Sequence, residues 1–376
     1  MGICICRNSH NWRSCSLLNW NYRGILGTSR SECSRSTHVS SRSRSEFYPK
    51  VRPWNRYQGL VKVLVIGRRG LIGSAVIRSI FPSQAIFGFE STIRWGKTQD
   101  AILDLQVLLG DFCEFVGQEK WIVLWSAGKG HLGSTTEEME TEEALFQTVL
   151  QTVSKWTNTD GLIGLVSSAG AIWSASSTRS VSEKSPPSGR SPYALSKLRQ
   201  EALLAETCQR SQIRGLAARV SSVYGINQDL SKPQGLISRL CASTVARRSI
   251  EIFVPLETTR NFIFSDDAAS MIAGTLTKIL ERDELRGRSS TRVICSRENY
   301  SIATICKAVE LVVHRKPLVV SKITRETQRY PLHFRLQTDH FAEISKFEST
   351  TLVAGISTVY KEMLGSFQAG RFAGQL

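Results

Sequence analysis

The sequence predicts an α/β protein in which helices wind on both faces of a parallel sheet and a smaller α+β part follows. The stretch at 61–77, VKVLVIGRRGLIGSAVI, joins a buried β-branched run to a helical pattern through glycines at 67, 70 and 73. Further apolar runs at 85–89, 121–125 and 162–166 alternate with helical patterns. With 376 residues, the chain is long enough for one large domain and a smaller one.

The glycine turn has the order strand, turn, helix that a dinucleotide-binding site requires. Gly67 lets the backbone turn sharply, Gly70 lets it approach a pyrophosphate, and Gly73 lets the helix pack on the strand. The phosphates would then bind the free N–H groups of Leu71, Ile72 and Gly73 at the positive end of the helix. A structural turn is the alternative, but the flanking strand and helix favour a Rossmann-type doubly wound domain.

The second strand, Ala85–Phe89, bears on the choice of dinucleotide. It ends at Glu90, whose carboxylate would accept hydrogen bonds from the adenosine ribose and favour NAD. Arg68 and Arg69 in the glycine turn, and Arg94 beyond the strand, would instead hold the 2′-phosphate of NADP. We lean to NAD and keep NADP as the alternative, since arginines in a turn are also common as solvated side chains.

Three later segments complete the expected cofactor-binding half. Asp104-Leu105 ends a third, poorly marked strand, and Trp121–Trp125 (WIVLW) is the fourth. The small residues Ser126-Ala127-Gly128 follow, so that Ala127 and Gly128 would lie beneath the dinucleotide. A long helix is expected at 137–156, and we assign its acidic first turn to compensation of the helix dipole. The fifth strand, 162–166, leads into Ser167 and Ser168.

A tyrosine and a lysine are the candidate catalytic residues. Tyr193 and Lys197 stand four apart in a helix that begins after Ser191-Pro192, so both side chains project from one face. A tyrosine hydroxyl has a pKa of about 10, and a nearby ammonium together with the positive nicotinamide ring lowers it so that a phenolate can form. The hydroxyl of Ser167 or Ser168 would hydrogen-bond the same substrate oxygen.

The C-terminal part has no catalytic motif of its own. We expect helices at 234–248, from 266 to 280 and at 301–314, and strands at 250–254, 292–295 and 318–321. The predicted domains are the following: a dinucleotide-binding domain at 59–225 to which 262–298 returns, and a substrate-binding portion at 226–261 and 299–376.

Residues 1–58 are Ser/Arg-rich and without periodicity, so we expect a disordered head outside the fold. An organellar transit segment is one interpretation. A start codon assigned too far upstream, with the protein beginning near Leu60, is the interpretation we favour. The head carries nine Arg and Lys50 against Glu32 and Glu46, about half of the formal charge of +16.

Because the remaining positive charge is spread without a basic stripe, we expect no nucleic-acid partner. No apolar run approaches the ~20 residues of a membrane span, so no membrane partner is expected. The nine cysteines lack the spacing of a metal site or a disulfide framework, so we predict no metal and a reducing, cytoplasmic location.

These motifs together resemble the NAD-dependent epimerase/dehydratase family of extended short-chain dehydrogenases/reductases, over about residues 61–270 and more loosely to the C-terminus. The resemblance rests on the following residues: Gly67–Gly73, Asp104-Leu105, Ser167-Ser168 with Ala171-Ile172-Trp173, Glu183, Ser191–Lys197, Arg219 with Val223-Tyr224-Gly225, and Thr259–Asp267. It implies that Asp104 and Leu105 contact adenine. It also implies that Arg260 binds a sugar-nucleotide diphosphate and that Ser222 stands where an asparagine often touches substrate. Family members are often dimers, so the resemblance implies a homodimer as well.

The departures from the family pattern narrow the expected reaction. The usual catalytic Ser/Thr position falls on Ala169, and the aspartate that usually follows Arg260 is Asn261. Sugar dehydratases resemble Thr-Asp-Glu where this chain has Ala169-Gly170-Ala171, so dehydration is not expected. We therefore predict a nucleotide-sugar epimerase with bound NAD, acting in polysaccharide or glycoconjugate synthesis. The alternatives are an NADPH-dependent keto-sugar reductase and a non-catalytic dinucleotide-binding sensor.

Overall fold

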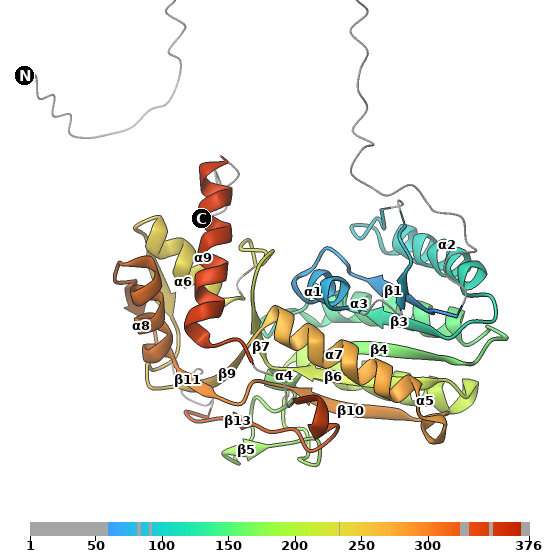
Figure 1. Ribbon diagram of the computed structural model, residues 1–376. Coiled ribbons are helices and arrows are strands. Elements are labelled where there is room, and N and C mark those ends of the chain that lie inside the picture. The colour runs from blue at the N-terminus through green and yellow to red at the C-terminus, as the bar shows by residue number, and fades with distance from the viewer. Residues whose placement is uncertain are drawn as a thin grey trace, which may run out of the picture. The chain divides into compact units, whose positions relative to one another are not determined.

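A six-stranded, all-parallel sheet lies at the centre of the described residues, in the order β10-β6-β4-β3-β1-β2 (Figure 1). The structure, a computed structural model, describes residues 59–80, 84–89, 92–232, 234–323, 331–345 and 349–369. The predicted head and Glu90 lie outside them. The sheet strands are β1 (Val61–Ile66), β2 (Gln84–Ile86), β3 (Trp121–Trp125), β4 (Gly161–Ser168), β6 (Arg214–Val220) and β10 (Ser289–Ile294).

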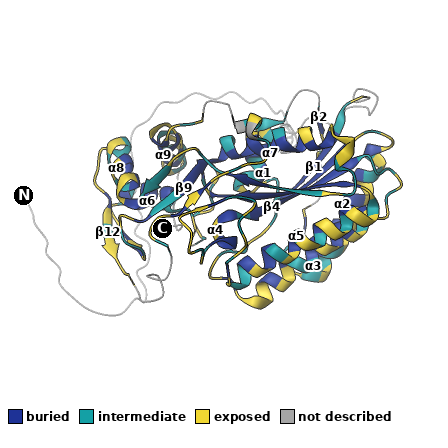
Figure 2. Ribbon diagram, turned by 90° about the horizontal axis from the view of Figure 1, so that it is seen from below, coloured by how far each residue is buried: buried dark blue, intermediate teal, exposed yellow. Residues whose placement is uncertain are grey.

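Helices cover both faces of this sheet, which confirms the predicted doubly wound α/β fold. Helices α1 (Leu71–Ser79) and α7 (Ser265–Leu280) pack on one face. Helices α2 (Thr98–Val116), α3 (Thr136–Val153) and α5 (Pro192–Ser211) pack on the other. Figure 2 shows the buried strands between these two layers, with the exposed residues on the outer sides of α3 and α5. All five residues of β3 are buried, as a central parallel strand requires.

One predicted strand is wrong. Asp104 and Leu105 lie within α2, which spans nineteen residues. Along the chain, α2 is the only element between β2 and β3, and no sheet strand is formed there by the described residues. The buried residues of α2 recur every three or four positions, which is the helical period. They are Ala101, Leu105, Leu108, Leu109, Phe112 and Val116. The sequence around Asp104 therefore encodes an amphipathic helix rather than a strand.

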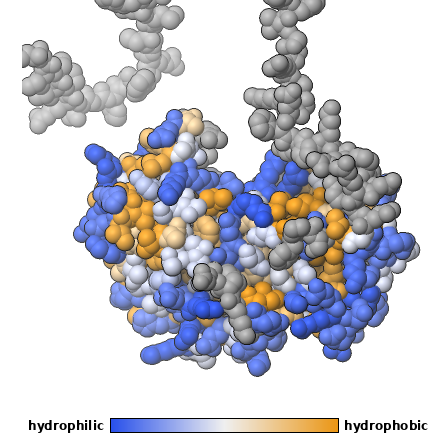
Figure 3. Space-filling view, viewed as in Figure 1, coloured by the Kyte–Doolittle hydropathy of each residue, from blue (hydrophilic) through white to orange (hydrophobic). Residues whose placement is uncertain are grey.

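The C-terminal part has a hydrophobic core of its own. It is built on α6 (Leu236–Val245), α8 (Ile302–Val313) and α9 (Leu352–Gln368), which contact one another and enclose buried side chains such as Ile237 and Ile356. In Figure 3 apolar residues lie at the surface over α6 and α8, and Leu311 of α8 is 59% exposed. The predicted helices and strands in this part are found, whereas α9 was not predicted. The division into two domains stays a prediction.

Short strands join this part to the central sheet. They form three small sheets in the orders β11-β9-β7, β12-β8 and β13-β5. Their bounds are β5 (Ser180–Val181), β7 (Ser222–Tyr224), β8 (Ser249–Ile252), β9 (Thr259–Phe264), β11 (Asn299–Ser301), β12 (Leu318–Ser321) and β13 (Arg335–Leu336). The remaining short helices are α4 (Ala169–Ile172), η2 (Asp283–Leu285) and η4 (Ala342–Ser345). Within the described residues, no helix has both the length and the apolar character to cross a membrane.

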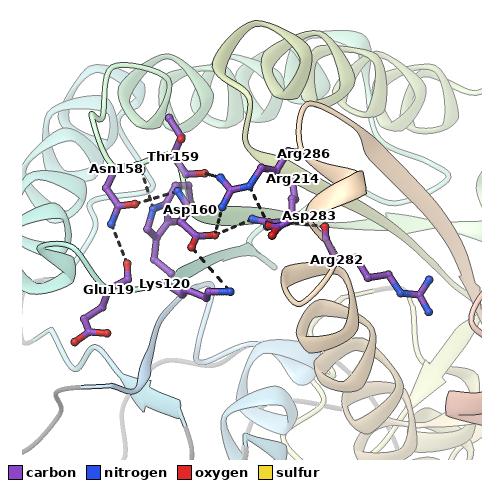
Figure 4. A network of polar contacts seen from close by, with 10 residues as sticks. Glu119, Lys120, Asn158, Thr159, Asp160, Arg214, Arg282, Asp283 and Arg286 are labelled. Atoms are coloured by element: carbon purple, nitrogen blue, oxygen red, sulfur yellow. Dashed lines mark hydrogen bonds and ion pairs between the residues drawn. The ribbon is translucent and has the colours of Figure 1, made fainter.

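A group of ion pairs joins the amino ends of three sheet strands (Figure 4). Arg214 begins β6, and its fully buried guanidinium donates to Asp160 at 3.0 Å, to Asp283 and to the Arg282 carbonyl at 3.0 Å. Arg286 lies 2.8 Å from the same Asp160 oxygen. We call the five charged side chains the amino-end network: Lys120, Asp160, Arg214, Asp283 and Arg286.

The outer edge of the sheet at β10 is bonded by side chains. The backbone N–H of Val293 donates to Glu183 Oε1 at 2.7 Å, and His340 Nδ1 lies 2.8 Å from the carbonyl oxygen of Thr291. The Glu183 carboxylate also accepts hydrogen bonds from Thr338 and Asp339. Glu183, which the family resemblance singled out, therefore fixes a segment near the C-terminus against this edge strand.

Candidate active site

The turn between β1 and α1 can be formed only by glycine at two of its three glycine positions. Gly67 has a φ of +91°, and a Cβ there would lie 2.6 Å from the backbone N of Ala127. A Cβ on Gly73 would lie 2.3 Å from the Gly67 carbonyl oxygen. Gly67 therefore makes the sharp turn and Gly73 brings the helix against it. Both structural roles were predicted from the sequence.

Gly70 is different, because its surroundings are open. It is the N-cap of α1, no side chain caps the helix, and the first turn holds no acidic residue. A Cβ on Gly70 would contact only the Gly67 carbonyl oxygen, at 3.3 Å. The backbone N–H groups of Leu71, Ile72 and Gly73 at the start of α1 are thus not covered by a capping side chain. An anion site at a helix N-terminus requires such accessible N–H groups. These residues fit the diphosphate of a dinucleotide.

The second wall of this turn is the segment after β3. Ser126 Oγ donates to the Ile66 carbonyl oxygen at 2.8 Å, which holds the ends of β1 and β3 together. Because the chain leaves β1 toward β2 and returns to β3 on the other side, this is the switch point where ligands bind in such sheets. Ala127 and Gly128 lie there, as the sequence predicted, and their contact with cofactor stays a prediction.

The arginines near the adenosine side have different partners. Arg94 makes a bidentate pair with Asp104, at 2.8 and 3.0 Å, so it is already neutralised. This pairing lowers the pKa of Asp104. The Arg68 guanidinium lies 4.9 Å from the centroid of the Phe89 ring, and Arg69 donates to Thr92 at 3.4 Å. Of the three arginines proposed for a 2′-phosphate, only Arg68 and Arg69 have no carboxylate partner in the contacts described.

The adenine contacts that the resemblance assigns to Asp104 and Leu105 find no support in these positions. The Leu105 side chain is fully buried in the core beneath α2. The Asp104 carboxylate lies at the surface and binds Arg94 through the backbone N–H and the guanidinium. Glu90, the predicted ribose ligand, is not among the described residues.

Tyr193, Lys197 and Ser168 meet at the carboxyl end of β4. Ser191 caps α5 by accepting a hydrogen bond from the Ala194 N–H at 3.1 Å, so Tyr193 lies in the first turn and Lys197 one turn later. The Lys197 Nζ atom lies 5.7 Å from the centroid of the Tyr193 ring. The Ser168 hydroxyl lies near enough to the phenol of Tyr193 to lower its pKa, and it also caps α4. The structure thus brings three of the four predicted catalytic residues together.

Ser167 faces another way along β4. Its hydroxyl donates to Glu201 Oε1 at 2.6 Å, and the same carboxylate binds Arg219 at 2.7 Å. The Arg219 guanidinium in turn lies 4.8 Å from the centroid of the Trp173 ring. Since neighbouring residues of a strand point to opposite faces, only one of the two serines can face Tyr193. Ser168 is therefore the serine beside Tyr193, and its contact with the substrate oxygen stays a prediction.

A buried carboxylate that was not predicted completes this group. Glu142 of α3 accepts a hydrogen bond from Lys197 Nζ at 2.8 Å, and the two side chains are 8% and 5% exposed. Burial by itself would raise the pKa of Glu142, but the Lys197 ammonium lowers it overall. Burial would likewise lower the pKa of Lys197, and the Glu142 carboxylate raises it overall. Both groups are therefore held in their charged forms.

Both charges affect the pKa of the Tyr193 phenol. Burial raises its pKa, the Lys197 ammonium and the Ser168 hydroxyl lower it, and the Glu142 carboxylate raises it. The pKa of Tyr193 is raised overall, so without a bound cation the phenol is protonated at neutral pH. The sequence-based expectation of a lowered pKa is therefore wrong for the chain alone, because it included neither burial, the largest cause of the shift, nor Glu142.

Glu142 was detectable in the sequence by its position. It falls on the apolar stripe of α3, between Met139 and Leu145, whereas Glu137 and Glu138 are exposed in the first turn. Glu138 completes a capping box with Thr135, as expected for acids that compensate a helix terminus. A carboxylate on the buried side of a helix requires a partner, which here is Lys197.

Two predicted substrate residues lie on the short strands that join the C-terminal part to the sheet. Arg260 of β9 is partly buried, burial lowers its pKa, and its Nη1 donates to the carbonyl oxygens of Thr259 and Pro331 at 2.8 and 2.9 Å. Ser222 of β7 is exposed. The neighbouring Asn261 is buried and its amide donates to the carbonyls of Ser296 and Glu298. Asn261 is thus a structural link to the segment after β10.

Within the described residues, no group of three or more His, Cys, Asp or Glu side chains is placed to hold a metal ion. His333 Nδ1 lies 3.3 Å from the Thr259 hydroxyl, and His340 Nδ1 lies 2.8 Å from the Thr291 carbonyl oxygen.

Comparison with known proteins gives a family match and a set of similar structures. The model of the NAD dependent epimerase/dehydratase family matches residues 63–284, which is more than half of the chain. No curated protein sequence gives a significant match.

Two of the similar solved structures are 4-epimerases. The UDP-glucuronic acid 4-epimerase of Bacillus cereus, solved with UDP-glucuronic acid and NAD, is 19% identical with a TM-score of 0.65, and the match covers 81% of this chain and 99% of that one. The UDP-glucose 4-epimerase of Thermotoga maritima, solved with UDP-glucose, is 16% identical with a TM-score of 0.66, over 82% and 100% of the two chains.

A dehydratase is similar to the same degree. The dTDP-glucose 4,6-dehydratase of Bacillus anthracis, solved with NAD, is 16% identical with a TM-score of 0.65, and the match covers 82% of this chain and 98% of that one. At these identities the structures establish the fold, and the reaction has to be argued from the residues of this chain.

Proposed function

The chain belongs to the NAD dependent epimerase/dehydratase family, and on that premise we propose that it is a nucleotide-sugar epimerase that works with bound NAD. One observation carries the proposal. Ser168, Tyr193 and Lys197 converge at the carboxyl end of β4, which is the same end of the parallel strands as the glycine turn after β1. Tyr193 packs against the segment after β3, because a Cβ on Gly130 would lie 2.9 Å from its ring.

The residues divide the chemistry as follows. NAD, when bound, supplies a reversible hydride acceptor. The Tyr193 phenolate takes the proton of the sugar hydroxyl during oxidation and returns it when the ketone is reduced from the other side. The Lys197 ammonium stabilises this phenolate, and the Ser168 hydroxyl donates a hydrogen bond to the same substrate oxygen. The positive charge of oxidised NAD would offset the raised pKa of Tyr193.

The absence of acidic groups after Ser168 supports epimerisation over dehydration. Elimination of water requires a carboxylic acid and a carboxylate base near the sugar, and the residues that follow Ser168 in α4 are Ala169, Gly170 and Ala171. Arg260 supports a substrate with a diphosphate, because its hydrogen-bond partners among the described residues are carbonyl oxygens, which do not neutralise its charge. Ser222, exposed on the neighbouring strand, is the second proposed substrate contact.

A keto-sugar reductase that uses NADPH is the second candidate. The raised pKa of Tyr193 favours the protonated phenol, which is the form that donates to a carbonyl. Arg68 and Arg69 beside the glycine turn would bind the additional phosphate of NADP. A cytoplasmic location, a homodimer and the lack of nucleic-acid and membrane partners remain predictions from the sequence.

The test combines cofactor content with substrate turnover. Purified full-length protein is dialysed, assayed for retained NAD, and incubated with UDP- and GDP-sugars while proton NMR follows the anomeric signals. Retained NAD and interconversion of two epimers support the proposal. NADPH oxidation with a keto-sugar supports the reductase instead. Cofactor binding without turnover of any sugar nucleotide would overturn both and leave a dinucleotide-binding sensor.

A further inference from the structure

Glu142 connects three parts of the site from a buried position on α3. One carboxylate oxygen accepts from Lys197 Nζ at 2.8 Å, and the other accepts from the backbone N–H of Gly130 at 3.2 Å. We propose that Glu142 is a positioning residue that keeps the Lys197 ammonium charged and in place beside Tyr193. The inference rests on the proposed function, in which Lys197 supports the acid–base role of Tyr193.

The hydrogen bonds around Lys197 orient its ammonium group. Lys197 Nζ also donates to Gln200 Oε1 at 3.1 Å, while Gln200 Nε2 donates to Ser196 Oγ at 3.3 Å and approaches the same Glu142 oxygen at 3.4 Å. Lys197 and Gln200 lie on α5 and Glu142 lies on α3, so the contact is made between the two helices. The flexible lysine side chain is thereby held by a carboxylate and an amide that are themselves buried.

The segment after β3 is shaped to accommodate this carboxylate. A Cβ on Gly128 would lie 2.9 Å from both Glu142 oxygens, and a Cβ on Gly130 would lie 2.6 Å from the Met139 side chain. A larger residue at either position would have to displace the Glu142 carboxylate or the Met139 side chain. Glu142 therefore fixes the segment proposed to contact the cofactor and the lysine that acts on the phenol, and it does so with a single side chain.

No other carboxylate among the described contacts takes the place of Glu142. Glu201, one turn after Lys197 on α5, is paired with Arg219 of β6. Glu143 of α3 is paired with Arg199 of α5 at 2.6 Å, and Arg199 is 49% exposed. From β4, the uncharged Ser168 lies beside Tyr193, whereas Ser167 is turned toward Glu201. The short helix α4, Ala169–Ile172, holds no charged residue. The segment after β3 contributes the exposed Lys129 and the half-buried His131, which bonds within its own loop.

The charge of Lys197 therefore depends on Glu142. A lysine in a buried site loses its proton at lower pH, by as much as 3–5 units when nothing compensates the burial. Without the carboxylate, the largest of the interactions that oppose the burial of Lys197 would be lost, and only the weaker ones with Tyr193 and Glu201 would remain. At alkaline pH the amine would become neutral and cease to stabilise the Tyr193 phenolate.

The test measures Lys197 directly and needs no substrate. The full-length protein is labelled with 13C-lysine, the Lys197 signal is identified by its absence in Lys197→Met, and its pH titration is compared in the parent and Glu142→Gln. We expect the pKa of Lys197 to fall by more than about 1 unit in Glu142→Gln. The matched control is Glu143→Gln, which removes the neighbouring glutamate of the same helix pair and should leave the titration unchanged.

An unchanged Lys197 titration in Glu142→Gln, or an equal shift in Glu143→Gln, would overturn the inference. Should Glu142→Gln not fold, Glu142→Asp withdraws the carboxylate by one methylene, and a smaller fall in the same pKa is expected. No fall in Glu142→Asp would then overturn it. If a sugar nucleotide that the protein converts is found, the fall of kcat at alkaline pH should begin at a lower pH in Glu142→Gln than in the parent. If none is found, the proposed function fails while the titration still decides the role of Glu142.

Discussion

Two clusters of buried charge lie at opposite ends of the central sheet. The amino-end network surrounds Arg214, whose fully buried guanidinium has two carboxylates and a carbonyl as acceptors (Figure 4). The pair at the carboxyl end consists of Lys197 and Glu142, both nearly inaccessible. In the network the carboxylates are hydrated, since the side chains of Asp160 and Asp283 are 31% and 79% exposed.

The difference shows how one protein uses buried charge for two purposes. In the network every ion except Lys120 has at least two oppositely charged partners, so the loss of one partner leaves another in place. An arginine, moreover, keeps its proton at any physiological pH. In the carboxyl-end pair each ion has one oppositely charged partner, and lysine and tyrosine exchange protons. Several partners for each ion suit a cluster that holds strand ends together. A single buried pair, such as Lys197 and Glu142, suits a site where protonation has to respond to a ligand.

The largest expected effect is on activity, from Tyr193→Phe. Removal of the phenol oxygen deletes the proposed proton carrier, so turnover should fall by about 100-fold or more. The unfolding midpoint should change little, because the ring and its packing remain. Epimerisation followed by proton NMR and a thermal melt measure the two quantities. Retained turnover in a folded Tyr193→Phe protein would remove Tyr193 from the mechanism.

Lys197→Met should have the largest effect on stability. It leaves Glu142 buried without a cation, which we expect to cost about 3–5 kcal/mol at neutral pH. Chemical denaturation at several pH values measures it. In the parent, the pKa of Glu142 is lower in the folded than in the unfolded state. The pair therefore stabilises the fold at pH values above the unfolded-state pKa, and this stability is lost as the pH falls through the folded-state pKa. In Lys197→Met burial raises that pKa, so stability should instead fall as the pH rises through it.

A second variant separates the two charges. Replacement of both residues, Lys197→Met with Glu142→Gln, should restore most of the lost stability because no unpaired ion remains. A double variant no more stable than Lys197→Met would show that packing, rather than unpaired charge, causes the loss.

Asp160→Asn should have a smaller effect, confined to stability. Arg214 retains Asp283 and the Arg282 carbonyl, so the expected loss is about 1–2 kcal/mol. Turnover should match the parent, because the change lies at the opposite end of the sheet. Denaturant unfolding and the NMR assay provide the comparison. A loss as large as that of Lys197→Met would contradict the idea that the network is duplicated.

The smallest effect is expected from Glu143→Gln. It removes one ion pair between α3 and α5, and Arg199 in that pair is 49% exposed, so the cost should be about 0.5 kcal/mol or less. Added salt should abolish the difference from the parent, since screening weakens exposed pairs. A salt-insensitive loss above this size would indicate that the contact is effectively buried.

The sequence was informative wherever a local pattern determines the structure. The WIVLW run is buried throughout as a central strand, and Gly67 and Gly73 are glycines because no Cβ fits beside the backbone there. The wrong strand at Asp104 also has a local cause, because the helical period of Ala101, Leu105 and Leu108 is present in the sequence. Tyr193 and Lys197 were identified because they share one helix turn.

What the sequence could not supply are contacts between distant segments. Lys197 meets Glu142 from 55 positions away, and Arg214 meets Asp283 from 69 positions away. Such pairs depend on how the helices and strands are stacked, which no periodicity encodes. The same holds for the choice between Ser167 and Ser168, because Glu201 on another element determines which hydroxyl is engaged.

The side chains bonded along β10 have a consequence for association with other chains. An open strand edge offers unpaired amide and carbonyl groups to any extended peptide, and aggregation often begins there. At β10 Glu183 and His340 occupy such groups at Val293 and Thr291. At the opposite border β2 has only three residues and offers little length for pairing. Both borders are thereby poor templates for a further strand, which protects the sheet from extending into a neighbouring molecule.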